Sequence, residues 1–345
     1  MSVEARRGMN PVNQNIRLAA DSGIAEGVLE LPSPFVLFHG GALPSAQLAW
    51  RLVGDARLPL VVAVGGISAH RRVFDEAQPT AGWWHEVVGP GRALDTHRCR
   101  VLGIDYLGGS GESTRPACSA TPPCLSSYDQ AEALRLLLDH LGIAKVSSIL
   151  GASYGGMVAL AFGERYPERV GRLIVISAAD RSHPMATAWR CVQRRTVRFA
   201  IQVGQPAAGL ELARALAMAT YRSAEEFAAR FADAPRQIDG QFVFPVEEYL
   251  FARGRDYAGK YQPEAFLCLS QSIDLHRVDA SRINVPTSVV AVREDQLVPI
   301  EDMRALVARL PSARLHEISS PHGHDAFLKE AGQLRPIFGC VYGDC

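Results

Sequence analysis

The chain has 345 residues, of which 48% are hydrophobic, and its 36 basic side chains balance 36 acidic ones. That length suits one large domain or a core with an inserted cap, and zero formal charge gives no electrostatic reason to expect a nucleic acid or an anionic membrane as partner. No uncharged apolar stretch approaches the roughly 20 residues of a membrane span, and no apolar segment of the signal-peptide type follows Arg6 and Arg7.

The first half of the chain predicts a sheet interleaved with helices. Residues 1–33 are polar and weakly patterned, which predicts a loosely held arm. From 35 to 60, short apolar runs separated by glycines predict antiparallel strands or a hairpin. Buried strands are predicted at 58–64, 101–104, 146–150 and 172–177, and an amphipathic helix at 128–141. This alternation of strands and helices indicates an α/β fold with a mostly parallel sheet.

The pattern changes near residue 181 and returns near 285. The intervening segment is rich in alanine, arginine and aromatic residues at helical spacing, with helices predicted at 207–218 and 224–231. We therefore expect an arm at 1–33, an α/β core at 34–180 and 281–345, and an inserted helical cap at 181–280.

The strongest motif is Gly151-Ala152-Ser153-Tyr154-Gly155, which follows the predicted strand at 146–150 and leads into an apolar helix. A G-x-S-x-G sequence between a strand and a helix is typical of the nucleophile elbow of the α/β-hydrolase fold. Small residues allow strand and helix to approach closely at this turn. Ser153 is therefore the candidate nucleophile.

In this fold the partners of the nucleophile follow in the order acid, then histidine. Asp295 comes just after the predicted strand at 289–292, and His324 lies in a glycine- and proline-containing loop after another strand at 315–318. We expect Ser153 to attack, His324 to take its proton, and Asp295 to hold the imidazole tautomer. Glu294 is an alternative acid and His322 an alternative base.

Acyl transfer also needs two backbone N–H groups that stabilise an oxyanion. One is expected from Tyr154, the residue after the nucleophile. The other is expected from the glycine-containing loop at 65–70, after the strand at 58–64, with Ile67 as the first choice and Gly66 as the second.

Seven cysteines are scattered through the chain without a C-x-x-C pair. Free thiols in a reducing cytoplasm are the expectation, and no metal site is predicted.

Together these motifs resemble the homoserine O-acyltransferases (O-acetyl- and O-succinyltransferases) of methionine biosynthesis, which have the α/β-hydrolase fold. The matching segments cover most of the chain and include F-H-G-G at 38–41, G-W-W at 82–84, G-P-G at 89–91, L-D-T at 94–96, G-A-S-Y-G-G-M at 151–157, V-Q-R at 192–194, D-Q-L-V-P at 295–299 and G-H-D-A-F-L at 323–328. The chain departs from the family pattern at Tyr154, where methionine is usual, at Gly65, where histidine is usual, and in the loop at 105–110.

The resemblance implies a ping-pong reaction in which an acyl-CoA, a substrate rather than a cofactor, acylates Ser153 and homoserine then accepts the acyl group. By matching the family's cap arginine, Arg194 would bind the amino-acid carboxylate. Asp325, next to His324, would bind the α-ammonium group, with capping of its own loop as the alternative. The resemblance also implies a homodimer formed through the cap.

The acyl donor and acceptor are less clearly indicated. In the succinyl-using members of the family that this chain resembles, the position two residues after the acid follows a pattern with arginine. This chain has Leu297 there, which slightly favours acetyl-CoA. Arg71 and Arg72, just after the 65–70 loop, are the sequence argument for succinyl-CoA. Serine as acceptor and an ester or thioester hydrolase with the same triad are alternatives, whereas the complete triad argues against a non-catalytic binding protein.

Overall fold

The computed structural model describes residues 16–19, 23–115 and 123–342. Within them, nine strands form one sheet in the order β1-β2-β5-β9-β6-β10-β11-β14-β15. Their bounds are β1 Ile16–Ala19, β2 Ile24–Glu30, β5 Gln47–Val53, β6 Leu60–Val64, β9 Arg100–Ile104, β10 Val146–Ala152, β11 Val170–Ile176, β14 Thr287–Val292 and β15 Ala313–Ile318. The run from β9 to β15 is parallel, whereas β1, β2 and β5 pair antiparallel. The expected α/β-hydrolase-type sheet is confirmed.

Helices cover both faces of the sheet, as its apolar strands require. In β11, Leu173 and Val175 belong to one buried cluster, whereas Ile174 and Ile176 belong to the other. The first cluster includes residues of α1 (Ser127–His140), α2 (Tyr154–Arg165) and α8 (Ile300–Arg309). The second includes residues of α9 (Ala326–Lys329) and α10 (Ala331–Phe338), together with Trp84.

The prediction of a loosely held arm at 1–33 is wrong for the part that the structure describes. Strand β2 pairs along its whole length with β5, from Ile24 opposite Val53 to Glu30 opposite Gln47, and β1 pairs with β2. The buried side chains of Leu29 and Leu31 join the core. Residues 1–15 and 20–22 lie outside the described residues.

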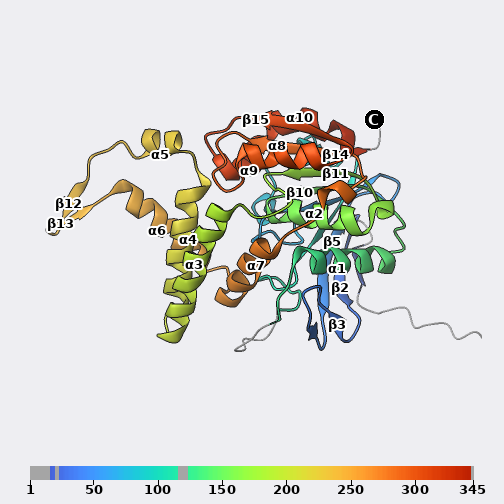
Figure 1. Cartoon of the computed structure of the whole chain (residues 1–345), viewed down its shortest axis with the longest axis horizontal. Helices are drawn as coiled ribbons and strands as arrows, with labels where there is room; N and C mark the ends of the chain where they lie inside the picture. Colours follow the sequence, from blue (N-terminus) through green and yellow to red (C-terminus); the bar gives the residue numbers. More distant parts are fainter. Residues whose placement is uncertain (1–15, 20–22, 116–122, 343–345) are drawn as a thin grey trace, which may run out of the picture.

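A cap lies between β11 and β14 in the sequence and beside the core in space (Figure 1). Its helices are α3 Pro184–Gln202, α4 Pro206–Tyr221, α5 Ala224–Arg230, α6 Pro245–Ala258 and α7 Pro263–Leu275. Four of these begin with proline, whose fixed φ suits the first helical position.

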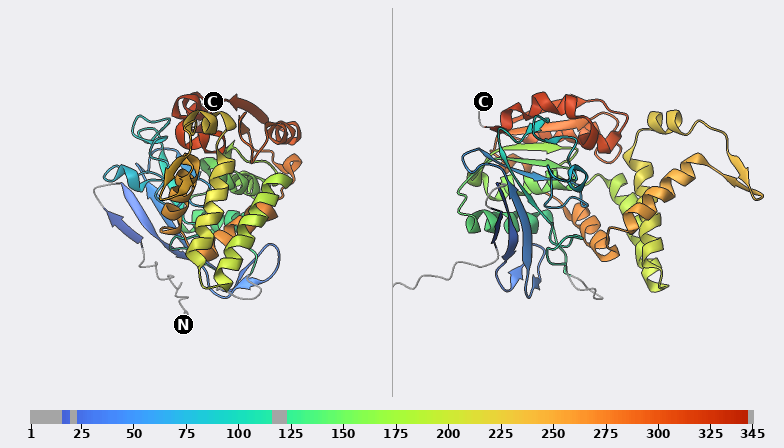
Figure 2. Two further views of the ribbon diagram at one scale, coloured as in Figure 1. Left: turned by 90° about the vertical axis from the view of Figure 1, so that its left-hand side faces the viewer. Right: turned by 180° about the vertical axis from the view of Figure 1, so that it is seen from behind.

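The cap also holds a hairpin that the sequence analysis did not predict, formed by β12 (Arg236–Ile238) and β13 (Gln241–Val243). Asp239 and Gly240 join the two strands, and both have positive φ (49° and 79°), as a tight hairpin turn requires. The hairpin projects away from the core (Figure 2).

Two short strand pairs and their connecting loops complete the described part of the core. The pairs are β3 (Phe35–Val36) with β4 (Ala42–Leu43), and β7 (Val88–Gly89) with β8 (Leu94–Asp95). No helix in the described part of the chain combines the length and apolar character needed to cross a bilayer.

Candidate active site

Ser153 stands at the sharp turn between β10 and α2, with φ 54° and ψ −122°. This conformation is rare for a residue with a side chain, so the surroundings must hold it in place. They do so by close backbone packing: a Cβ added to Gly151 would lie 2.2 Å from the Gly155 carbonyl oxygen, and one added to Gly155 would lie 2.2 Å from that of Val64. The elbow therefore depends on glycine at both positions.

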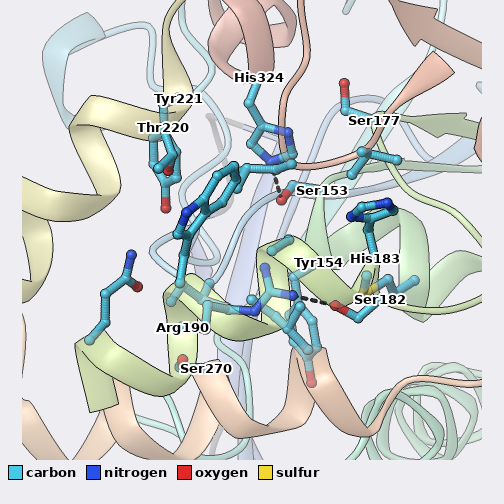
Figure 3. Close-up of a pocket in the computed structure, with 18 of the residues that line it drawn as sticks. Ser153, Tyr154, Ser177, Ser182, His183, Arg190, Thr220, Tyr221, Ser270 and His324 are labelled. Atoms are coloured by element: carbon cyan, nitrogen blue, oxygen red, sulfur yellow. Dashed lines mark hydrogen bonds between the residues drawn. The ribbon is translucent and has the colours of Figure 1, made fainter. Parts of the chain in front are cut away.

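Ser153, His324 and Asp295 form a continuous hydrogen-bonded line. Ser153 Oγ lies 2.8 Å from His324 Nε2, and His324 Nδ1 lies 2.7 Å from Asp295 Oδ2 (Figure 3 shows the serine and histidine). The histidine and aspartate side chains are 7% and 0% exposed. The geometry suits a hydroxyl activated by a base whose orientation is fixed by a carboxylate.

The second carboxylate oxygen of Asp295 is also occupied. Its Oδ1 accepts hydrogen bonds from the backbone N–H groups of Leu297 at 2.9 Å and Val298 at 3.0 Å. The carboxylate is therefore held in one orientation, with Oδ2 directed at the imidazole.

The pKa of His324 is perturbed by its surroundings. Burial lowers this pKa, but the charge and the hydrogen bond of Asp295 raise it, and Asp325 raises it further, so the net pKa lies above the ordinary value for histidine. A raised pKa favours the imidazolium that forms when the base takes a proton from Ser153.

The two alternative residues have other contacts. Glu294 accepts hydrogen bonds from Ser319 Oγ and from the Ser320 backbone N–H, the latter at 2.8 Å. His322 Nδ1 lies 2.6 Å from an Nη atom of Arg222. Glu294 therefore fixes the start of the histidine loop, and neither residue is hydrogen-bonded to Ser153 or His324.

The loop at 65–70 passes beside the nucleophile and is held at several carbonyl groups. The Gly65 carbonyl accepts hydrogen bonds from the Gly155 backbone N–H at 2.8 Å and the Tyr106 hydroxyl at 2.7 Å. The Ile67 carbonyl accepts one from the Tyr261 hydroxyl of the cap at 2.7 Å. These contacts fix the backbone that carries the Ile67 N–H.

Ile67 and Tyr154 both line the cavity at Ser153, and the backbone N–H of each has no hydrogen-bond acceptor within the described residues. The Tyr154 side chain turns away into the core, where its hydroxyl lies 2.6 Å from Ser272 Oγ. Two unoccupied N–H donors beside a nucleophile are what an oxyanion hole requires.

Two cavities meet at Ser153 and His324. The first, which we call the α3 cavity, is lined on the cap side by Ala186, Trp189, Arg190 and Gln193 of α3. The second, which we call the Arg214 cavity, is lined by Arg214, Tyr221, Asp325 and Trp83. The nucleophile can therefore meet a group in either cavity.

Arg214 has no carboxylate partner at ion-pair distance among the described residues. Its guanidinium carbon lies 5.1 Å from the ring centre of Tyr221 and 4.8 Å from that of Tyr257. Asp325 lines the same cavity, and its carboxylate lies 3.3 Å from Arg222 Nε. A cation and a carboxylate facing one cavity form a site suited to a zwitterion.

The structure does not support the expectation that Arg194 binds the amino-acid carboxylate. Its guanidinium is buried against α7, where Nη1 lies 2.5 Å from Asp274 Oδ2 and donates to the Ser270 carbonyl at 2.9 Å. Arg194 does not line either cavity, whereas Arg190, one turn earlier on α3, does. Which arginine of a helix faces a site depends on how the helix packs.

Arg190, Arg214 and Tyr261 were not singled out from the sequence. Arg214 could have been found from the sequence, because it is the one charged residue in the otherwise small and apolar segment Ala213-Arg214-Ala215-Leu216-Ala217. Tyr261 could not have been found in this way, since its role depends on a hydrogen bond to Ile67, 194 residues away in the sequence.

Comparison with known proteins finds the same fold. The α/beta hydrolase fold family model matches residues 34–331. A solved structure, the homoserine O-acetyltransferase from Bacillus anthracis, superposes with a TM-score of 0.83 over 93% of this chain and 97% of that chain, at 17% identity. That similarity concerns the fold.

Relatives of known activity are closer in sequence. The homoserine O-succinyltransferase of Xanthomonas campestris pv. campestris is 42% identical over 92% of this chain and 85% of its own length. The serine O-succinyltransferase of Litchfieldella anticariensis is 34% identical over 91% and 97%, and the homoserine O-acetyltransferase of Thermus thermophilus is 37% identical over 86% of each. The chain therefore belongs to the homoserine O-acyltransferase family of the α/β-hydrolase fold.

Proposed function

We propose that the protein is an acyl-CoA-dependent homoserine O-acyltransferase of methionine biosynthesis that works through an acyl-enzyme on Ser153. The observation that carries this proposal is the meeting of two cavities at one serine, one of them with a cation and a carboxylate suited to an amino acid. The names of the relatives support homoserine as the acceptor.

In the first half-reaction, Ser153 Oγ forms a bond to the thioester carbon while its proton passes to His324 Nε2. The carbon–sulfur bond then breaks, and the same proton goes to the departing CoA sulfur. The N–H groups of Ile67 and Tyr154 stabilise the oxyanion that forms between these steps. Asp295 keeps the proton on Nδ1, so that Nε2 is free to accept.

In the second half-reaction, the hydroxyl of the acceptor gives its proton to His324 and its oxygen bonds to the acyl carbon. The bond to Ser153 Oγ breaks, and the proton returns to the serine. Arg214 would hold the acceptor's carboxylate and Asp325 its ammonium group, which positions the hydroxyl at the acyl-enzyme. Transfer exceeds hydrolysis when this acceptor replaces water near the ester.

The rival functions differ in what attacks the acyl-enzyme. A serine O-acyltransferase has the same amino-acid groups to recognise on a shorter side chain, and the name of one relative keeps that acceptor open. An esterase or thioesterase needs only water and has no use for both a cation and a carboxylate facing the Arg214 cavity. A homodimer and a cytoplasmic location stay predictions.

The test is a matrix of acetyl-CoA and succinyl-CoA against homoserine, serine and no amino acid, with CoA release followed over time. We expect a burst of CoA equal to the enzyme concentration without acceptor, and steady turnover with homoserine. Ser153→Ala should show neither. Equal turnover with and without amino acid would indicate a hydrolase, and faster turnover with serine would reassign the acceptor.

A further inference from the structure

The arginines at the wall of the α3 cavity outnumber the carboxylates that pair with them. Asp274 is shared by two arginines: Arg190 reaches its Oδ1 from Nε at 2.8 Å and Nη2 at 2.7 Å, and Arg194 reaches its Oδ2 at 2.5 Å. The side chains of Arg190 and Asp274 are only 12% and 10% exposed. One buried carboxylate therefore serves two buried guanidinium groups.

A second shared carboxylate lies next to it, but its arginines are more exposed, at 49% for Arg181 and 38% for Arg309. Asp180 is shared by Arg181 at 3.1 Å and Arg309 at 2.6 Å, and Arg181 also lines the α3 cavity. Among the described residues, these four arginines have no other acidic partner, so each pair keeps one positive charge in excess. The desolvation argument applies to the first pair: surplus charge on the buried Arg190 and Arg194 is unfavourable unless an anion comes to meet it.

Within the part of the chain that the structure describes, no aspartate or glutamate lines the α3 cavity itself. Its polar lining includes Arg181, Ser182 and His183, just before α3, and Arg190 and Gln193 of α3. The N-terminus of this helix adds positive potential beside the first three. The charge of Arg190 reaches the reaction centre, since it acts to lower the pKa of His324. Figure 3 shows Arg190 bonded to Ser182 in the same cavity as Ser153.

We propose that the α3 cavity holds the acyl group and that Arg190, supported by Ser182 and Arg181, binds a carboxylate at the far end of that group. The donor is then a dicarboxylic acyl thioester of the succinyl class rather than acetyl-CoA. The inference rests on the proposed function, because it assigns the acyl part of the same reaction.

The sequence argument for acetyl does not oppose this assignment. Leu297 lines the α3 cavity beside Val298, where its apolar side chain suits the methylene groups of an acyl chain. The sequence argument for succinyl rested on the wrong residues: Arg71 pairs with Asp105 at 2.5 Å and also with Glu112, and it lines neither cavity at Ser153.

Two other anions are less suited to Arg190. The carboxylate of the acceptor has Arg214, which lies in the other cavity and has no carboxylate of its own. The phosphates of CoA are common to every acyl-CoA and lie many bonds away from the thioester carbon. If Arg190 contacts the acyl tail, the effect of replacing it should differ between acyl donors. If it contacts the acceptor or the CoA phosphates, the effect should be the same for every donor.

The test measures acylation of Ser153 in single turnovers, with succinyl-CoA and acetyl-CoA as donors. We expect the wild type to prefer succinyl-CoA, and Arg190→Gln to lower kcat/KM for succinyl-CoA on the order of 10²-fold, with little change for acetyl-CoA. Arg190→Lys should recover only part of the loss, because a point charge lacks the planar pair of donors. Arg195→Gln, on the exposed side of the same helix, is the matched control.

Several results would overturn the inference. A wild type that prefers acetyl-CoA would contradict it directly. Equal losses for both donors would assign Arg190 to CoA or to the packing of α3 on α7, and an altered homoserine KM with normal acylation would assign it to the acceptor.

A binding measurement separates this inference from the proposed function. Monomethyl succinate, a mimic of the succinyl ester, should bind Ser153→Ala, which the ester cannot acylate, more tightly than methyl butyrate does. Adding Arg190→Gln to this variant should remove the difference. If neither donor acylates Ser153 but this preference persists, the proposed reaction fails while the anion site stands. If the two esters bind alike, the anion site fails.

Discussion

Replacing Asp295 by asparagine should disable the proposed base without disturbing its position. In the native protein, Oδ1 accepts two backbone N–H groups, from Leu297 and Val298, and Oδ2 faces His324 Nδ1 at 2.7 Å. An asparagine has one oxygen and one NH₂ group to place at these two positions. The structure determines which group goes where.

Placing the NH₂ group against two N–H donors would leave those buried donors unsatisfied, at about 1–3 kcal/mol each. The amide oxygen therefore stays with the backbone, and the NH₂ group faces His324. Nδ1 must then accept a hydrogen bond, which moves the proton to Nε2, the atom that should take the proton of Ser153. The expected loss in kcat is about 10⁴-fold, or ~5.5 kcal/mol of transition-state free energy.

The assay is the acylation burst of Asp295→Asn with Glu294→Gln as control, followed by thermal unfolding of both. Glu294 bonds only the loop residues Ser319 and Ser320 among the described contacts, so its variant should lose stability but retain kcat within about tenfold. If Asp295→Asn retained more than about a hundredth of the native rate, the tautomer argument would be refuted. A larger loss in Glu294→Gln would move the acid by one residue.

Three further predictions follow from contacts elsewhere in the molecule. Arg214→Lys should raise the homoserine KM at least about tenfold while the acylation burst survives, because a lysine cannot form two parallel hydrogen bonds with a carboxylate; loss of the burst would contradict a role in acceptor binding. Tyr261→Phe removes the hydroxyl that fixes the Ile67 carbonyl, so kcat should fall about fivefold, the equivalent of ~1 kcal/mol, with the donor KM unchanged, and a change in KM alone would point to a packing role. His276 is buried between Ser127 and the Ala179 carbonyl, and burial lowers its pKa to about 4. Since the folded state binds this proton less readily than the unfolded state, stability is full above pH 6.5 and should fall by about 3 kcal/mol as pH drops toward 4; urea unfolding of His276→Gln should show a flatter pH dependence, and an identical slope would refute the assignment.

The positions of the core residues could be predicted because they follow from local patterns. Ser153, Asp295 and His324 each come just after an apolar strand, and the carboxyl ends of parallel strands meet at one edge of a sheet. The strand order did not have to be known for these three to be expected together. The same reasoning identified the loop that carries Ile67.

The cap residues could not be placed in this way. Arg190 and Arg194 are one turn apart on α3, and only the packing of α3 against Asp274 of α7 decides which of them faces the cavity. The strands β1 and β2 were missed for a related reason. β2 is held in the sheet by its hydrogen bonds to β5, and β1 by its pairing with β2, so their extended conformation depends on neighbours that a local sequence pattern does not reveal.

The division of labour between the core and the cap has a consequence for how such enzymes diversify. The nucleophile, base and acid are all mounted on the core, and the glycine-tight elbow leaves Ser153 no freedom to adjust. The charged groups that we propose to distinguish one substrate from another, Arg190 and Arg214, belong to α3 and α4 of the cap. Substitution within residues 184–275, or exchange of that whole segment between relatives, is therefore expected to change which molecules bind while Ser153, Asp295 and His324 keep their positions. A mutant library confined to the cap, with Tyr261 kept because its hydroxyl holds the Ile67 carbonyl, should therefore sample new donors and acceptors without moving the triad.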